Sequence, residues 1–408
     1  MLQITSPLND HVFQRNLQNT AKVTFQGKAD AVLSIIATPI TKGVQVIEHN
    51  IKPDSFNNFS KTVVLTAGDY EVSISSTTEI QKIKVNVGVV FVVMGHSFSE
   101  GNGSSFVTSD RVICPDSFLS PMTDTSLYQS TGFMKMKNVN TDTVKNYESL
   151  EQLNYSKSRG IWGRMADKLV ELYDVPVCVV NCGFGGTTIE QWALSAQNQY
   201  FEHGFADYSK RMPIVKFLNA LKYLIPRTGC QGVLCIHGDN DIAQKPTAQQ
   251  IADWYKIIID TARNESGFKN LNFVLATSAY ESPYSEPIIE GTRLAIQQNT
   301  NVLPGPAIDQ YSTEFRLSAN DFHLNTAGEA KAAQDFAKIL GTGDYLLNAI
   351  PVTIEPKEDK TEVINITSNA TPTVQNTLKD NSKYFLYGGL ALLSVFLIWL
   401  VSLIPSRK

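Results

Sequence analysis

The sequence lacks several features that would place it in well-known classes of protein. Its five cysteines are an odd number, and their spacings match neither a zinc ribbon nor a CxxC redox motif. It has no basic block, and 35 Lys and Arg against 39 Asp and Glu give a net charge of -4, which argues against nucleic acid as a partner. Residues 1–16 contain neither a basic leader nor an apolar core of signal-peptide length. We therefore expect buried free thiols, no disulfide framework, no metal, no cofactor and no bound nucleic acid.

One long uncharged stretch lies near the C-terminal end. Residues 385–404 carry no charge, and as a helix rising ~1.5 Å per residue they would span about 30 Å, the thickness of a bilayer core. Tyr384, Tyr387 and Trp399 suit the membrane interfaces. This pattern predicts a single-pass membrane helix over 384–405. Basic residues flank it equally on both sides, so the side of the membrane that the rest of the chain occupies stays open.

The composition and hydrophobic pattern of the remaining sequence divide it into two domains and a linker. Residues 1–86 read as short strands separated by turn residues, with clean alternation over 70–75, which predicts a small immunoglobulin-like β-sandwich. From 87 to 345, apolar strands alternate with helical stretches, the mark of βαβ units and a parallel sheet. Residues 346–383, rich in Thr, Asn, Pro and charged residues, predict a flexible linker. The expected fold class is therefore α/β.

The second domain is organised around residues 88–101, which read GVVFVVMGHSFSEG. Residues 89–94 form an apolar run rich in β-branched side chains, as in a strand buried on both faces. Open α/β folds place ligand sites at the carboxyl ends of their strands, so the glycine-containing turn that follows presents Ser97 to a site. A Gly-x-Ser is also found in ordinary strand-to-loop turns, so Ser97 needs the support of other residues.

Polar loops follow two further apolar strands, which are expected at 175–180 and 232–236. The first strand leads into NCGFGGTTIEQW at 181–192, and the second into HGDND at 237–241. A fourth polar segment, Asp-Phe-His at 321–323, comes just before the last predicted helix. Because the carboxyl ends of parallel strands meet at one edge of a sheet, we expect these loops to lie together.

The four segments resemble the motifs of the SGNH, or GDSL-like, hydrolase superfamily. The first motif, GxSxxxG, is present as Gly95, Ser97 and Gly101, and the third, GxND, is present at 238–241. The second, GGTTIEQW at 185–192, is most similar to the corresponding stretch of sialate O-acetylesterase-like carbohydrate esterases. The resemblance covers about 89–340 and implies a flavodoxin-like three-layer α/β/α fold and a carboxylic ester hydrolase.

The resemblance also implies roles for individual residues. Ester cleavage needs a nucleophile, a base and hydrogen-bond donors for the oxyanion. By resemblance Ser97 is the nucleophile and His323 the general base, which later protonates the leaving alcohol. The backbone N–H groups of Ser97 and Gly186 and the side-chain amide of Asn240 would form the oxyanion hole.

The sequence departs from the superfamily pattern in ways that affect the site. The common DxxH is shortened here to Asp321-Phe322-His323, and we expect Asp321 to orient His323, with a backbone carbonyl or a distant carboxylate as the alternative. His96 and His237 stand where relatives tend to carry glutamine, and they are expected to line the substrate pocket or to be hydrogen-bonded at strand ends. Trp192 is a candidate for stacking on a sugar ring, with helix packing as the alternative.

The leading hypothesis is a serine esterase that removes acetyl or another small acyl group from a carbohydrate, so that the expected partners are an acetylated glycan or small ester and a membrane. A second hypothesis keeps the fold but assigns a lipid or other non-sugar ester. A third is a non-catalytic, membrane-tethered carbohydrate-binding or adhesion protein on the same scaffold. The least favoured is a metal-dependent phosphoesterase, in which a DxH motif usually comes first in the chain; its ligands would be His237, Asp239, Asp241, Asp321 and His323.

Overall fold

The computed structural model describes residues 1–101, 107–116, 131–138, 160–280, 285–341 and 349–355. All of these residues belong to one compact unit, Met1–Lys357. The expected membrane helix and most of the expected linker lie outside the described residues. Within the described ranges, no helix combines the length and the apolar character needed to cross a bilayer.

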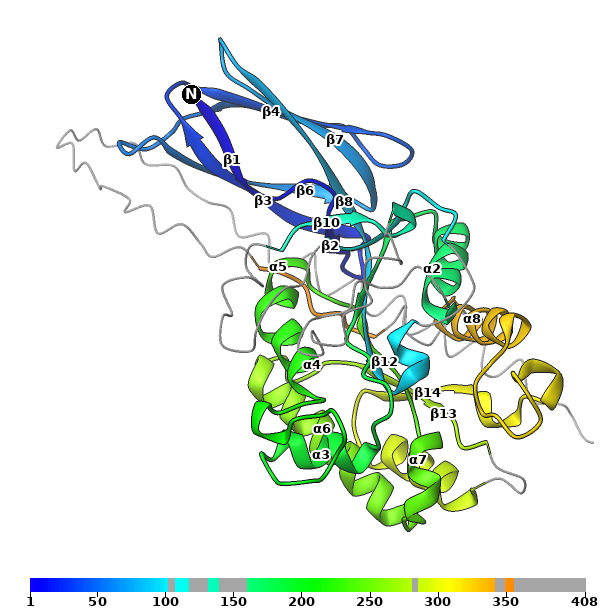
Figure 1. Ribbon diagram of the computed structural model, residues 1–408. Coiled ribbons are helices and arrows are strands. Elements are labelled where there is room, and N and C mark those ends of the chain that lie inside the picture. The colour runs from blue at the N-terminus through cyan, green and yellow to red at the C-terminus, as the bar shows by residue number, and fades with distance from the viewer. Residues whose placement is uncertain (102–106, 117–130, 139–159, 281–284, 342–348, 356–408) are drawn as a thin grey trace, which may run out of the picture. The chain divides into compact units, whose positions relative to one another are not determined.

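The first part of the chain forms two antiparallel sheets with a common core (Figure 1). One sheet has the strand order β1-β3-β6, and the other has the order β5-β4-β7-β8. Their buried side chains, such as Phe25 in the first and Val72 in the second, belong to one hydrophobic cluster. Two packed sheets agree with the expected sandwich, whereas its immunoglobulin-like type stays a prediction. The strand bounds are β1 (Leu2–Ser6), β3 (Thr20–Ala29), β4 (Leu33–Pro39), β5 (Val46–Ile51), β6 (Asn58–Thr66), β7 (Gly68–Ser75) and β8 (Ile80–Gly95).

β8 is a single strand that belongs to both parts of the chain. Its first half, up to Val87, pairs antiparallel with β7, and β2 (His11–Gln14) pairs with it in parallel. From Val89 onward it pairs in parallel with β11 (Val177–Asn181) and β12 (Gly232–His237). The domain boundary predicted at 86/87 therefore falls inside a continuous strand.

The sheet of the second part has the order β10-β9-β11-β8-β12-β13-β14. Its neighbouring strands are parallel, except that β10 runs antiparallel to β9 at one edge. The expected parallel sheet is therefore mixed at one edge, where the predicted connection between the first two strands contributes the antiparallel pair β9 and β10. The remaining bounds are β9 (Val112–Pro115), β10 (Phe133–Lys135), β13 (Phe273–Thr277) and β14 (Val302–Ala307).

Helices cover both faces of this sheet, giving the expected three layers (Figure 1). Val89, Phe91 and Val93 of β8 share a core with α2 and α8, whereas the intervening residues share a core with α3, α4, α6 and α7. Burial on both faces explains why this run is apolar without alternation. The helix bounds are α2 (Gly160–Tyr173), α3 (Ile189–Ala196), α4 (Val215–Asn219), α5 (Ile225–Thr228), α6 (Ala248–Ser266), α7 (Glu286–Gln298) and α8 (Thr326–Gly341), with a π-helical turn, η6 (Ala220–Leu224), between α4 and α5.

Two further predictions can be compared with the structure. All five cysteines are buried and free. Residues 349–355 pack against the α/β part, because Val352 and Cys230 exchange backbone hydrogen bonds of 2.9 Å. The chain is thus still held against the fold beyond residue 346, where the linker was expected to begin.

Candidate active site

A sharp turn at the end of β8 presents Ser97. Gly95 has φ +127°, and a side chain there would collide with the backbone oxygen of Ile236, so only glycine fits. The chain then enters the 3-10 helix η1 (Ser97–Glu100), whose Ser99 hydroxyl donates a 2.7 Å hydrogen bond back to the Met94 carbonyl. This bond fixes the turn and leaves Ser97 partly exposed.

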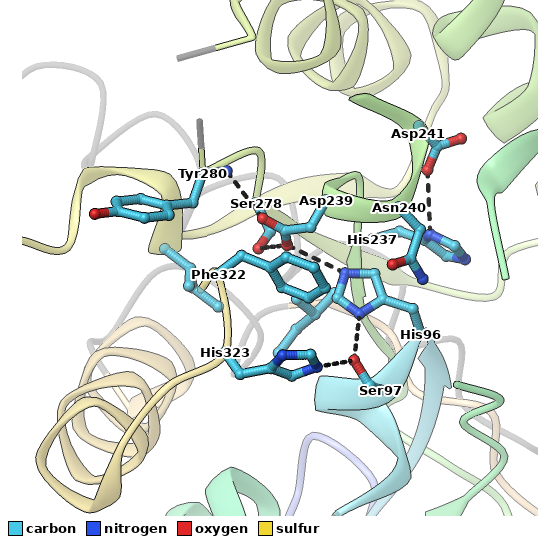
Figure 2. A network of polar contacts seen from close by, with 12 residues as sticks. His96, Ser97, His237, Asp239, Asn240, Asp241, Ser278, Tyr280, Phe322 and His323 are labelled. Atoms are coloured by element: carbon cyan, nitrogen blue, oxygen red, sulfur yellow. Dashed lines mark hydrogen bonds and ion pairs between the residues drawn. The ribbon is translucent and has the colours of Figure 1, made fainter. Parts of the chain in front are cut away.

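His323 reaches Ser97 from the loop before α8 (Figure 2), and Asp321 lies on the same loop. Ser97 Oγ lies 3.0 Å from His323 Nε2, and His323 Nδ1 lies 2.8 Å from Asp321 Oδ1. Burial acts to raise the pKa of the Asp321 carboxyl, but hydrogen bonds from the backbone and ring of His323 outweigh it, so the pKa is lowered. The carboxylate is therefore charged at neutral pH. The structure brings all three residues expected for catalysis into one hydrogen-bonded chain.

The loop between β11 and α3 runs beside the nucleophile turn. Phe184 N–H donates a 2.8 Å bond to the Gly95 carbonyl, which ties this loop to the end of β8. Gly186 has φ +71°, and a Cβ there would lie 2.9 Å from the ring of Phe205. The side-chain amide of Asn240 donates a 2.9 Å bond to the Thr187 carbonyl, which joins the third motif to the second. The residues expected to form the oxyanion hole thus lie on adjoining loops at the expected edge of the sheet.

His96 lies behind Ser97 rather than in an open pocket. Its side chain is completely buried, with Nδ1 3.4 Å from Ser97 Oγ and Nε2 3.2 Å from Asp239 Oδ2 (Figure 2). Asp239 also accepts hydrogen bonds from the Ser278 hydroxyl at 2.5 Å and from the Tyr280 backbone N–H at 2.9 Å. Burial acts to raise the pKa of Asp239, but its contacts with His96 and Ser278 outweigh burial, so the pKa is lowered. Sequence reasoning missed this contact of His96 with both Ser97 and Asp239.

His237 also lies in the interior, so the structure gives it no pocket-lining position. Its Nδ1 is 3.7 Å from Asp241 Oδ2, and its ring meets the Trp192 ring edge-on. Burial lowers the pKa of His237 well below its usual value, and burial raises the pKa of Asp241 to about 7. Asp241 Oδ1 accepts a 2.8 Å bond from the Ile189 N–H in the first turn of α3. The Asp241 carboxyl thus connects the start of α3 to the loop that follows β12.

Trp192 is a core residue of α3. None of its surface is exposed, and its indole N–H donates a 2.9 Å bond to the Thr187 hydroxyl. Thr188 and Gln191 cap the helix reciprocally and fix its start. The ring has no face free for a sugar in this structure, so the position corresponds to the packing alternative.

The residues of the metal hypothesis do not gather into one ligand set. His237 and Asp241 are buried beneath α3, whereas Asp321 and His323 face Ser97 from the other loop. In the part of the chain that the structure describes, no group of three or more His, Cys, Asp or Glu residues is arranged to hold a metal ion.

A comparison with protein families gives one match, which covers the second part of the chain. A family model described as "Carbohydrate esterase, sialic acid-specific acetylesterase" matches residues 87–341. A search among curated proteins gave no match. Among similar solved structures, a carbohydrate acetylesterase from Xanthomonas citri has 14% identity and a TM-score of 0.49, and the match covers 83% of this chain and 74% of that chain. A protein from Arabidopsis thaliana has 16% identity and a TM-score of 0.40, with 61% of this chain and 95% of that chain covered. An acetyl xylan esterase from the rumen bacterium Butyrivibrio proteoclasticus has 12% identity and a TM-score of 0.32, with 84% of this chain and 97% of that chain covered. The matched region extends from β8 to the end of α8 and contains all four motifs.

Proposed function

Because the chain belongs to the family of carbohydrate esterases described as sialic acid-specific acetylesterases, and is therefore a carboxylic ester hydrolase, we propose that it removes acetyl or another small acyl group from a carbohydrate through a Ser-His-Asp triad. The observation that carries this proposal is the chain of contacts from Ser97 Oγ to His323 Nε2 at 3.0 Å and from His323 Nδ1 to Asp321 Oδ1 at 2.8 Å. A serine, a base on its hydroxyl and a carboxylate on the base are the parts that acyl transfer through a serine requires.

In the first half of the reaction Ser97 is acylated. His323 Nε2 takes the hydroxyl proton while Oγ attacks the acyl carbon, and the Asp321 carboxylate stabilises the imidazolium that forms. The negative charge that develops on the acyl oxygen needs fixed donors. The backbone N–H groups of Ser97 and Gly186 are two of these. The third is the Asn240 amide, which uses one of its two hydrogens on the Thr187 carbonyl and keeps the other for the oxyanion.

The departure of the alcohol, which completes acylation, and the attack of water in the second half both require access from solvent, and His323 has it. Its side chain is 40% exposed, so the proton on Nε2 can pass to the leaving alcohol, and a water molecule can then take the place of that alcohol. His323 removes a proton from this water as it attacks the acyl carbon, and returns the proton to Ser97 Oγ as the bond between that carbon and Oγ breaks and the acid leaves.

The test is hydrolysis of p-nitrophenyl acetate by the full chain, compared with the Ser97→Ala variant. We expect turnover by the wild type and only background hydrolysis by the variant, and then release of acetate from acetylated sugars. A preference for long acyl chains over acetyl would favour the lipid-ester alternative. Inactivity of the wild type on short and long acyl esters would instead favour the carbohydrate-binding scaffold.

We also propose that residues 385–404, which lie outside the described residues, anchor the protein in a membrane. Their uncharged composition and length support this proposal. The measurement is fractionation of cells that produce either the full chain or a chain ending at Lys357, the last residue of the compact unit. We expect the full chain to stay with the membranes after an alkaline wash and the shortened chain to be released. Release of both chains would contradict the anchor.

A further inference from the structure

Ser97 has two histidines within reach of its hydroxyl, and each histidine has its own carboxylate. His323 is paired with Asp321, and His96 is paired with Asp239 (Figure 2). The proposed function uses only the first pair. The second pair is an additional Ser-His-Asp arrangement built on the same nucleophile.

The surroundings of His96 favour one arrangement of its hydrogens. Its Nε2 lies 3.2 Å from Asp239 Oδ2 but is not aligned for a hydrogen bond, so the contact is electrostatic, and the nearby carboxylate favours the hydrogen on this nitrogen. Asp239 is held in place by the Ser278 hydroxyl and the Tyr280 backbone N–H. In the neutral ring the other nitrogen, Nδ1, then has a free lone pair directed at Ser97 Oγ, 3.4 Å away.

Aromatic neighbours keep the His96 ring in this orientation. The ring centroids of Phe98 and His237 lie 5.2 and 5.3 Å from that of His96, and the Phe322 centroid lies 6.1 Å away. None of the His96 side chain is exposed. The ring can therefore exchange a proton with the serine, but it reaches neither a leaving alcohol nor an incoming water.

We propose that His96 is a second general base for Ser97, supported by Asp239, and that it acts only in the acylation step. This inference rests on the proposed role of Ser97 as the nucleophile. In the step, the proton of the Ser97 hydroxyl moves to His96 Nδ1 as Oγ bonds to the acyl carbon. The bond from that carbon to the leaving oxygen then breaks, and a leaving group such as p-nitrophenolate departs as the anion. The proton stays on His96, where the Asp239 carboxylate balances the imidazolium. His323 is nearer to Oγ and remains the main base, and it alone can serve the leaving alcohol and the water.

This division of roles makes a specific prediction for an enzyme without His323. An ester of p-nitrophenol needs no proton for its leaving group, so the His323→Ala variant should still be acylated through His96. The same variant has no base for the water, so the acetyl group should remain on Ser97. We expect one equivalent of p-nitrophenol in a burst, ~100-fold slower than acylation of the wild type, followed by a stop.

The experiment is stopped-flow measurement of the burst by the full chain, with the mass of the intact protein recorded afterwards. The His323→Ala variant should gain one acetyl group, and adding His96→Gln should slow its burst by a further ~100-fold. His11 provides a matched control, because it is also a buried histidine, with its Nε2 2.8 Å from the Arg227 carbonyl. The His11→Gln/His323→Ala variant should keep the burst of His323→Ala. Ser97→Ala should show no burst.

The outcomes separate this inference from the proposed function. No burst from a folded His323→Ala variant, or equal bursts with and without His96, would overturn the role of His96 while leaving a wild-type enzyme that depends on Ser97. An inactive wild type would overturn the proposed function itself. If His96→Gln does not fold, Asp239→Asn in the His323→Ala background tests the same pair, and an unchanged burst there also overturns the proposal.

Discussion

Asp321 binds His323 twice through one oxygen, because its Oδ1 lies 2.8 Å from both the backbone nitrogen and the ring Nδ1 of His323. A carboxylate that accepts the backbone N–H two residues further on is a common way of forming a tight turn. With one residue between them, Asp321 and His323 form a local turn. This turn fixes the conformation of the loop and also orients the imidazole ring of His323.

The two bonds of Asp321 can be separated by substitution. Asp321→Asn keeps an oxygen for the backbone N–H but removes the charge that supports the imidazolium, so we expect kcat to fall ~1,000-fold or more with little change in Tm. Asp321→Ala removes both bonds and should also lower the free energy of unfolding by about 1 kcal/mol. Steady-state kinetics and thermal melts check both variants. A wild-type kcat in Asp321→Asn would show that another group orients His323.

Removal of the Asn240 amide tests the oxyanion hole. Asn240→Ala loses a donor that acts on the transition state, so kcat should fall by about 100- to 1,000-fold while KM changes little. Asn240→Asp, which keeps the shape but has no amide hydrogen to donate, should lose a similar factor. If kcat fell less than about fivefold in both variants, the Asn240 side chain would have only a structural role, through its hydrogen bond to the Thr187 carbonyl.

The position of Trp192 predicts a structural effect of its substitution. Trp192→Phe leaves space in the core and removes the bond to Thr187, so the free energy of unfolding should fall by about 1–3 kcal/mol. KM for acetylated sugars should stay unchanged, since the ring is completely buried. Denaturant melts and steady-state kinetics on the same preparation distinguish a role of Trp192 in core packing from a role in stacking on a sugar ring. A raised KM at unchanged stability would support the stacking role.

Asp241 should make stability depend on pH. Its pKa is raised by burial from 3.8 to about 7, so the stability it contributes is fully present below about pH 3.8 and is lost as pH rises through 7. Replacement by Asn removes this loss, and the variant should gain stability relative to the wild type as pH rises from about 4 to 7, by at most ~1.4 kcal/mol per pH unit. The gain should level off above about pH 7.

Denaturant unfolding at several pH values measures this difference. The exposed Asp253 offers a matched control, because Asp253→Asn makes the same chemical change at the protein surface. A constant difference between the wild type and Asp241→Asn across the range would contradict the assignment.

The sequence was sufficient for the parts of the site that depend on local pattern. The apolar run before Ser97, the glycine turn and the polar segment at 321–323 each have a recognisable composition, and the parallel order of the strands brings them to one edge. β14 was not predicted because Pro304 and Pro306 interrupt its pattern, which an edge strand tolerates.

The environment of a side chain was harder to predict. A buried and an exposed tryptophan look alike in a sequence, so the surroundings of Trp192 had to come from the fold. The contact between His96 and Asp239 depends on the register of β8 against β12, in which Gly95 lies opposite Ile236. No spacing along the chain encodes that register, and the contact was therefore missed.

The continuity of β8 affects how this protein can be recombined with others. One stretch of backbone, Ile80–Gly95, is the last strand of the N-terminal sheet and also the strand that carries the nucleophile. A crossover at residue 86 would join half of this strand to a foreign partner and disturb the turn at Ser97. We expect the N-terminal sheets and the nucleophile to be inherited as one piece, so that the accessory module of this esterase is not interchangeable.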